Sequence, residues 1–257
     1  MELNLPSSKN PKLAKLLKRV EQDESLDQMY KCVNINAVDR LGMPDHGPVH
    51  IKIVINIALK LLRLLHKNNI QTGIEKNYGM TFADSEIVTF LAALLHDIGM
   101  VVHRSNHEEF SIMLAPPIID RLLQDYYTTR EQVIIKAEVL HAIYAHQAAT
   151  KCLTLEAGVV KVADALDMNE GRSRISFEAG EVNIHSVSSL AIKEVKLLQG
   201  EKKPVRIEIV MTNSAGIFQI DELLKRKLQG SSIRDLVEIC ALIEGEAEKK
   251  IVSFYEM

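Results

Sequence analysis

Several histidine and aspartate side chains of this sequence fall where a helix should be buried, and these residue types bind metal ions. His96 and Asp97 directly follow residues 87–95, in which every residue except Thr89 is apolar. A helix without a water-facing stripe is expected to be buried on all sides. A carboxylate at its end needs a cation or a tight hydrogen-bond network, because burying it without a partner costs several kcal/mol. A metal ion would meet that need.

Other candidate ligands lie on separate predicted helices. His50 shares one helical stripe with Val54 and Leu61, so it should point into the core from the first turn. Asp164 lies inside the run 158–166, which is apolar on nearly every side. Neutral imidazole and carboxylate groups suit zinc, manganese, iron and cobalt. Four such ligands on separate helices can hold one cation inside a helical bundle.

Two further predicted helices carry histidines. Ser105 and Glu108 match the capping-box pattern S-x-x-E, which would begin a helix with His107 in its first turn. In the next predicted helix, His146 falls on the apolar inner face. His141 lies five residues earlier and competes with it, and the periodicity of the inner face favours His146.

The order of these residues resembles the HD-domain superfamily of metal-dependent phosphohydrolases. The matching segments are HIKIVINIA at 50–58, LLHDIG at 94–99 and VVKVADALD at 159–167. Two more segments resemble the extra histidines of the two-metal branch: HEEFS at 107–111 and AIYAH at 142–146. The resemblance extends over residues 25–175, and it implies a mainly α fold with an HD-type helical bundle.

The resemblance also implies a ligand set for metal ions. A first ion would be bound by four residues, His50, His96, Asp97 and Asp164. Asp97 would bridge to a second ion bound by His107 and His146. The cofactor is therefore expected to be one or two divalent metal ions, and these ligands accept Mn, Fe, Co, Zn, Ni or Mg.

The chemistry implied by the resemblance is hydrolysis of a phosphate ester by metal-activated water. The substrate would be a nucleotide or another small phosphorylated molecule, and Asp97 would be catalytic as well as a ligand. Charge on the phosphoryl oxygens needs cations nearby, and Lys161 lies one turn before Asp164 on the same face. Further candidates for substrate binding, which could also lie at the surface, are Arg104, Arg172, Arg174 and His46. The further candidates for a catalytic role are His103 and His141.

Ordinary structural roles remain open for the same residues. His96 and Asp97 could be an ion pair that closes a buried helix, and His50 and Asp164 could be hydrogen-bonded polar residues of the core. His107 could be exposed, because the first turn of a helix often is.

Two other functions also remain open. A mixed-valent diiron oxygenase uses the same six-ligand pattern in this superfamily. A non-catalytic regulator could bind a nucleotide without turnover and use the C-terminal region for interactions. Lys161 and the run GRSR at 171–174 favour a phosphorylated substrate, so the phosphohydrolase is the preferred interpretation.

The composition excludes several classes of protein. Hydrophobic residues make up 47% and charged residues 25% of the 257 residues, as in ordinary globular proteins. The net charge of −3 gives no electrostatic reason to expect nucleic acid or an anionic membrane as partner. No apolar stretch could span a membrane, and the N-terminus does not read as a secretory signal. The three cysteines are scattered, so we expect a cytoplasmic protein.

The chain divides into two predicted domains. Residues 1–178 form the helical metal-binding domain, and residues 179–257 form a small α+β domain. The second domain is predicted to contain strands at 190–197, 205–211 and 250–255, and helices at 221–228 and 232–243. Exposed strand edges could pair in a homodimer.

Overall fold

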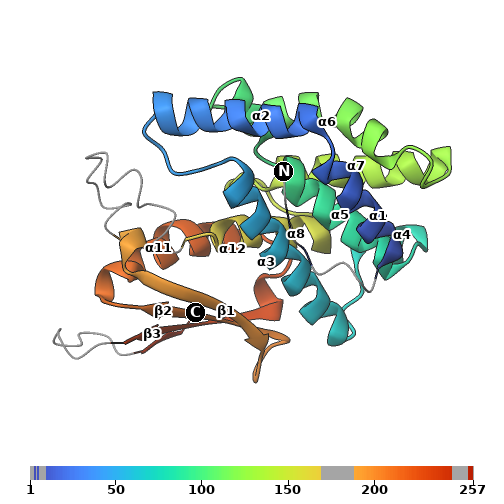
Figure 1. Ribbon diagram of the computed structural model, residues 1–257. Helices are drawn as coiled ribbons and strands as arrows, with labels where there is room; N and C mark the ends of the chain where they lie inside the picture. The colour runs from blue at the N-terminus through green and yellow to red at the C-terminus, as the bar shows by residue number, and fades with distance from the viewer. Residues whose placement is uncertain (1–2, 4, 6–9, 169–187, 245–253, 257) are drawn as a thin grey trace.

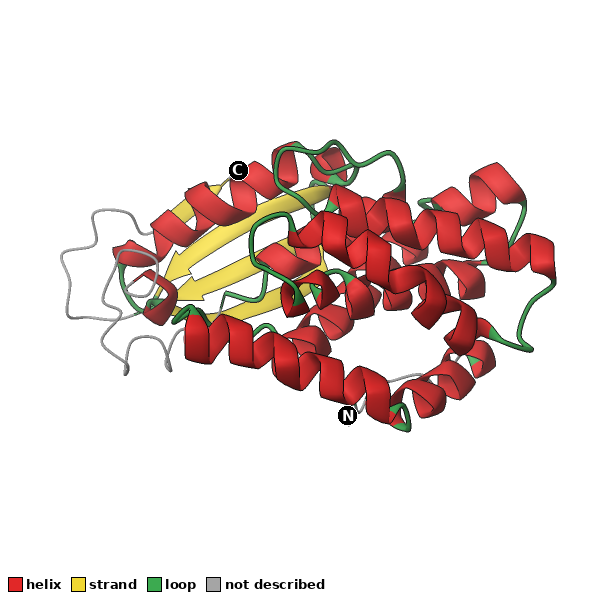
Figure 2. Ribbon diagram, turned by 90° about the horizontal axis from the view of Figure 1, so that it is seen from above, coloured by secondary structure: helices red, strands yellow, loops and turns green. Residues whose placement is uncertain are grey.

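The computed structural model describes residues 3, 5, 10–168, 188–244 and 254–256. A helical body is followed by a small sheet that carries short helices on one face (Figure 1). Figure 2 shows the sheet at one end of the molecule and the long helices at the other. The predicted mainly α fold with a small C-terminal α+β region is confirmed. The predicted domain boundary at residue 178 lies outside the described residues and stays a prediction.

The helical body contains α1 (Pro11–Glu21), α2 (Glu24–Asn34), η1 (Ile35–Arg40), α3 (Pro48–Lys67), α4 (Gly73–Tyr78), α5 (Phe82–Leu95), η2 (Ile98–Val101), α6 (His107–Leu123), α7 (Thr129–Ala145) and α8 (Leu155–Ala165). The C-terminal region contains β1 (Ile192–Gln199), β2 (Val205–Met211), η3 (Ser214–Gly216), α11 (Ile217–Gln219), η4 (Ile220–Leu224), α12 (Lys225–Gln229), η5 (Arg234–Leu236), β3 (Val237–Ile243) and β4 (Phe254–Glu256). No helix of the described part of the chain has the length and apolar character needed to cross a membrane.

Helix α5 is the centre of the helical body. Every residue from Asp84 to Leu95 is buried, and for residues 87–95 the absence of a polar stripe predicts this burial. The helix begins at a capping box in which Thr81 and Asp84 bond to each other's backbone N–H groups. It packs against α3, α7 and α8. Because these three helices surround α5, the residues at its C-terminal end lie in the middle of the bundle.

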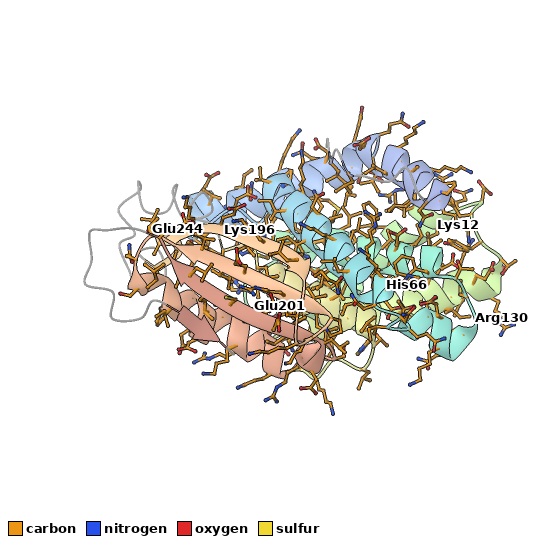
Figure 3. The ribbon with its side chains drawn as sticks, turned by 90° about the horizontal axis from the view of Figure 1, so that it is seen from below. Lys12, His66, Arg130, Lys196, Glu201 and Glu244 are labelled. Carbon is orange, nitrogen blue, oxygen red and sulfur yellow. The ribbon has the colours of Figure 1, made fainter. Side chains whose placement is uncertain are left out.

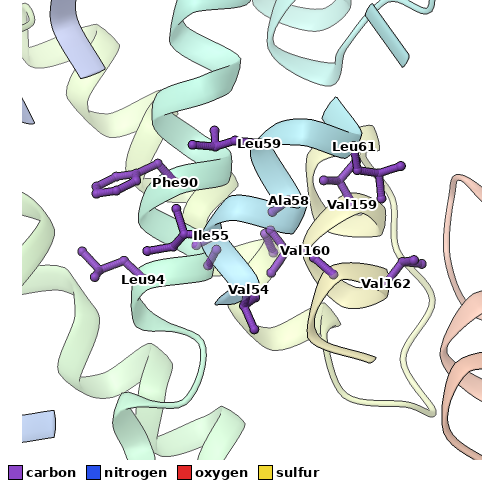
Figure 4. Packing of buried hydrophobic residues seen from close by; sticks show 14 of the residues in the cluster. Val54, Ile55, Ala58, Leu59, Leu61, Phe90, Leu94, Val159, Val160 and Val162 are labelled. Atoms are coloured by element: carbon purple, nitrogen blue, oxygen red, sulfur yellow. The ribbon is translucent and has the colours of Figure 1, made fainter. Parts of the chain in front are cut away.

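The packing of α3, α5 and α8 forms the core beside the C-terminal end of α5 (Figure 4). Ile55 of α3, Phe90 of α5 and Val160 of α8 are all fully buried. Side chains in such a close-packed core have little freedom to shift. The three helices therefore hold the polar residues near their ends in fixed relative positions.

The sheet has the strand order β1-β2-β3-β4. β1 and β2 are antiparallel, β2 and β3 are parallel, and β3 and β4 are antiparallel. Ile207 and Ile209 of β2 are fully buried, and Arg206 and Glu208 alternate with them. Lys196 of β1 and Glu201 of the following turn lie on the side of the sheet seen in Figure 3. One face of the sheet is therefore apolar and packs on helices, as is usual for antiparallel pairs.

The predicted helix at 232–243 is wrong, because residues 237–243 form strand β3. All five residues from Val237 to Ala241 are buried, so the segment has no alternating pattern. A short apolar run of this kind cannot be told from a buried helix by periodicity. Its parallel pairing with β2 requires a crossover connection, which contains α11, η4 and α12. That crossover lays α12 against α8 of the helical body.

Candidate metal centre

The structure brings six candidate ligands together in the middle of the helical body. They form two adjacent clusters, and the ligand atoms within each cluster all lie within 4.8 Å of one another. The first cluster consists of His50, His96 and Asp164, and the second consists of Asp97, His107 and His146. They come from the first turn of α3, the C-terminal end of α5, the last turn of α8, the start of α6 and the end of α7.

Asp97 lies between the two clusters and directs one carboxylate oxygen to each. Its Oδ2 lies 3.4 Å from Nε2 of His50 and 3.5 Å from Nε2 of His96. Its Oδ1 lies 3.1 Å from Nε2 of His107 and 3.6 Å from Nε2 of His146. This is the geometry that a bridging carboxylate requires.

The junction of α5, η2 and α6 fixes Asp97 in that position. Ser111 of α6 donates a hydrogen bond to the carbonyl of His96 at 2.7 Å and accepts one from the N–H of Gly99 at 2.9 Å. A Cβ atom on Gly99 would lie 2.1 Å from the carbonyl oxygen of His107. Only glycine therefore allows α6 to approach closely enough for His107 to reach Asp97.

Contacts at Nδ1 orient the two histidine rings of the first cluster. Nδ1 of His50 lies 2.5 Å from Oδ2 of Asp167, and Nδ1 of His96 lies 2.9 Å from the carbonyl of Ala93. Both partners are hydrogen-bond acceptors, so each Nδ1 carries the proton and each Nε2 presents a lone pair. The two Nε2 atoms are 3.3 Å apart.

His146 of the second cluster follows the same arrangement. Nδ1 of His146 donates to the carbonyl of Ile143. Nδ1 of His107 lies 3.0 Å from both the carbonyl of Arg104 and a carboxylate oxygen of Glu108. The two Nε2 atoms are again 3.3 Å apart.

These contacts make the centre a good fit for divalent metal ions. Within each cluster, nitrogen lone pairs converge on one another and on carboxylate oxygens, which is repulsive unless a cation lies between them. Imidazole nitrogens with acceptors at the opposite ring nitrogen are the usual ligands of zinc and similar metals. The bridging position of Asp97 suits two ions.

Electrostatics keep both carboxylates of the centre ionised. Burial acts to raise the pKa of Asp97, but the surrounding imidazoles, His96 first, outweigh it and hold the pKa well below its usual value. Burial also acts to raise the pKa of Asp164, and Lys227 and His96 hold it well below the usual value. These anions attract positive charge to the centre.

The histidines of the second cluster shift in opposite directions. Burial lowers the pKa of His146. Burial acts to lower the pKa of His107 too, but its hydrogen bonds with Asp97 and Glu108 raise it to about 9. A proton on His107 and a metal ion therefore compete for the same place beside Asp97.

A cavity of about 710 Å³ opens onto the centre. It is bordered by Asp97, Asp164 and His146 together with two of the other predicted residues, His46 and Arg104. The guanidinium of Arg104 also lies against the ring of His107, 2.7 Å from Nδ1.

The structure does not bring two other predicted residues, His103 and His141, to this cavity. His103 is exposed and accepts a hydrogen bond from the N–H of Ser105. His141 accepts one from the N–H of Leu153, so of the two competing histidines His146 is the one that reaches the centre. The remaining predictions, Arg172 and Arg174, lie outside the described residues.

The expectation for Lys161 also differs from the structure. Lys161 is fully buried, and its ammonium group donates hydrogen bonds to the carbonyls of Ala148 and Thr150. Burial lowers its pKa. The ammonium group of Lys161 therefore stabilises the loop after α7. Lys161 does not border the cavity.

Two residues at the centre were missed from the sequence. Asp167, which orients His50, lies three residues after Asp164 in VADALD, and that spacing was a usable signal. Lys227 of α12 forms an ion pair with Asp164, 63 residues away in the chain. No local pattern could have identified that contact.

Comparisons with known proteins agree with this geometry. The family model described as HD domain matches residues 49–169, a range that contains all six clustered ligands. The uncharacterized protein MJ1020 of Methanocaldococcus jannaschii is 43% identical over 225 residues, which cover 88% of this chain and 87% of that protein.

Proposed function

This chain belongs to the HD-domain family, and from that premise we propose that it is a metal-dependent phosphohydrolase acting on a small phosphate ester. The observation that carries the proposal is the position of Asp97, with one carboxylate oxygen toward each histidine cluster. Members of the family are commonly metal-dependent hydrolases. The proposed substrate is a nucleotide or another small phosphorylated molecule.

The six clustered residues would hold the metal ions. His50, His96, Asp97 and Asp164 would bind the first ion, and His107 and His146 would bind a second, with Asp97 shared. Divalent ions in such a site supply a water molecule whose pKa is lowered to about 7, and they offer positive charge to the phosphoryl oxygens. Asp167, Ala93 and Ile143 would keep the imidazole rings in orientation.

The chain's own residues would complete the chemistry at the cavity. Arg104 would donate hydrogen bonds to phosphoryl oxygens, which a guanidinium does well. His46 is 7% exposed, and its Nδ1 lies 2.7 Å from the carbonyl of Pro44. If Nδ1 donates its proton to that carbonyl, a doubly protonated His46 would transfer the proton on Nε2 to the leaving group.

Three basic side chains at the cavity support a phosphorylated substrate over the substrate of an oxygenase. Arg104, Arg226 and Lys227 all border the same cavity. Cations placed around a metal centre stabilise the charge of a phosphoryl group during its transfer. The volume of about 710 Å³ is within the range of small-molecule sites, about 300–1,000 Å³.

The test is turnover by protein purified without chelator and reconstituted with Mn²⁺, Zn²⁺ or Fe²⁺. Phosphate release would be measured on a panel of nucleotides, sugar phosphates and p-nitrophenyl phosphate. Metal-dependent release of phosphate from at least one ester is the expected result. Oxygen consumption by the iron-loaded protein without phosphate release would favour the diiron oxygenase instead.

A further inference from the structure

The C-terminal region places a lysine directly against the candidate metal centre. The ammonium group of Lys227, on α12, is ion-paired with Oδ2 of Asp164. The other oxygen of that carboxylate, Oδ1, lies 3.5 Å from Nε2 of His50 and 3.7 Å from Nε2 of His96. One carboxylate therefore links the first cluster to a cation that lies outside the helical body.

Lys227 also borders the cavity that opens onto the centre. Its side chain is 20% exposed, and Asp164 is the one hydrogen-bond acceptor that the structure gives its ammonium within the described ranges. An ammonium group has three N–H donors. Donors therefore remain for a ligand that enters the cavity.

The turn after α12 holds this helix tightly on α8. Ser231 Oγ donates to the carbonyl of Gly158 at 3.1 Å, and Ser232 Oγ donates to the carbonyl of Thr154 at 2.6 Å. A Cβ atom on Gly158 would lie 2.2 Å from Ser232 Oγ, so glycine permits the close approach. The packing of this turn on α8 therefore places α12 close to the metal centre.

A second contact comes from the loop after α7. The N–H of Cys152 donates to the carbonyl of Gly230 at 2.9 Å. Lys161 braces the same loop, and a Cβ atom on Gly230 would lie 2.7 Å from its ammonium nitrogen. Lys227 lies three residues before Gly230, so its backbone is fixed before any ligand binds.

From this arrangement we propose that Lys227 binds the substrate by donating a hydrogen bond to a non-bridging oxygen of its phosphoryl group. The inference rests on the proposed phosphohydrolase function and adds to it a residue outside the range 49–169 that the family model matches. The C-terminal region then completes the active site. Lys227 takes the role that the sequence suggested for Lys161.

A purely positioning role for Lys227 makes a different prediction. If the ammonium only orients Asp164, its removal should disturb the first cluster and weaken metal binding. If it binds the phosphoryl group, its removal should leave metal binding intact and weaken phosphate binding. Removing a positive charge next to a cation site does not by itself lower metal affinity.

The experiment compares Lys227→Met and Lys227→Arg with the wild-type protein, each loaded with Mn²⁺. Lys225→Met is the matched control, because Lys225 is on the same helix, is paired with Asp221 and does not border the cavity. Bound manganese would be measured by elemental analysis, and the affinity for inorganic phosphate by titration calorimetry. Circular dichroism would check that each variant is folded.

Lys227→Met should keep the manganese of the wild type and bind phosphate about ten- to hundredfold more weakly, the usual loss for a hydrogen bond to a charged group. Lys227→Arg should recover most of that affinity, and Lys225→Met should match the wild type. Unchanged phosphate affinity in Lys227→Met would overturn the proposal, as would parallel loss of manganese.

Phosphate binding separates this inference from the proposed function. If the loaded wild type binds phosphate through Lys227 but hydrolyses none of the tested esters, the inference stands and the proposed hydrolysis is contradicted. If the loaded wild type binds no phosphate, the inference is overturned whatever the turnover assays show.

Discussion

Replacement of Asp167 by asparagine tests whether the orientation of His50 matters to the metal centre. Oδ2 of Asp167 lies 2.5 Å from Nδ1 of His50, and Asp167 is only 6% exposed. Asparagine keeps the shape and an acceptor oxygen but removes the negative charge that makes the imidazole a stronger ligand. The substitution therefore changes the electronic character of one ligand with little change in packing.

The expected loss follows from the strength of this contact. A hydrogen bond to a charged group contributes about 1.5–3 kcal/mol, against about 0.5–1.5 kcal/mol for a neutral one. Replacing the former with the latter costs about 1–2 kcal/mol, and each 1.4 kcal/mol is tenfold in affinity. Metal affinity should thus fall about five- to thirtyfold, which overlaps the range of about ten- to hundredfold seen when such supporting groups are changed.

The assay is competition for Zn²⁺ or Mn²⁺ against a chelator of known affinity, with the variant and the wild type side by side. Asp221→Asn is a suitable control, because that aspartate is partly exposed, is paired with Lys225 and does not border the cavity. Metal affinity of Asp167→Asn within twofold of the wild type would refute the reasoning that Asp167 supports His50.

Two further predictions concern the second cluster. Gly99→Ala should lower the free energy of unfolding by about 3 kcal/mol, at the upper end of overpacking effects, because the added Cβ would lie 2.1 Å from a backbone oxygen of His107. Urea denaturation would measure it, and a change below about 0.5 kcal/mol would contradict the close packing described. Metal affinity should rise with pH up to about 9, because the metal must displace the proton of His107, whose pKa is raised to about 9. Isothermal titration calorimetry of metal binding between pH 6 and 9 would measure this affinity. A metal affinity that does not change with pH would contradict the displacement of a proton from His107.

The resemblance to the HD-domain superfamily implied the six clustered residues, and the positions of several of them in the sequence were unusual in themselves. Asp97 follows the run 87–95, which is apolar except for Thr89, and Asp164 lies inside the mostly apolar run 158–166, so ordinary core packing did not account for them. His107 was ambiguous in the sequence, since the first turn of a helix can face water. In the structure it is 4% exposed because Gly99 lets α6 approach.

Other features depended on contacts that local patterns do not contain. Lys161 is three residues from Asp164, a separation of about 300° around the helix. Lys161 is therefore about 60° short of a full turn from Asp164, and its ammonium group is directed toward Ala148 and Thr150 instead of the cavity. Lys227 reaches the centre only because β3 pairs in parallel with β2 and the crossover packs on α8. The pattern of residues in β3 does not distinguish this strand from a buried helix.

The predicted homodimer is a separate matter, because it depends on a partner chain. It stays a prediction, and light scattering on the purified protein would check it.

Metal content per chain is the measurement that tests the central claim most directly. It would be made by elemental analysis on protein purified without chelator and then reconstituted with Mn²⁺, in parallel for the wild type and Asp97→Asn. We expect two metal ions per chain in the wild type, and loss of metal and activity in Asp97→Asn with an unchanged helical circular-dichroism spectrum. Full metal content and turnover in Asp97→Asn would contradict the bridging position, and a wild type that binds no metal would contradict the metal centre itself.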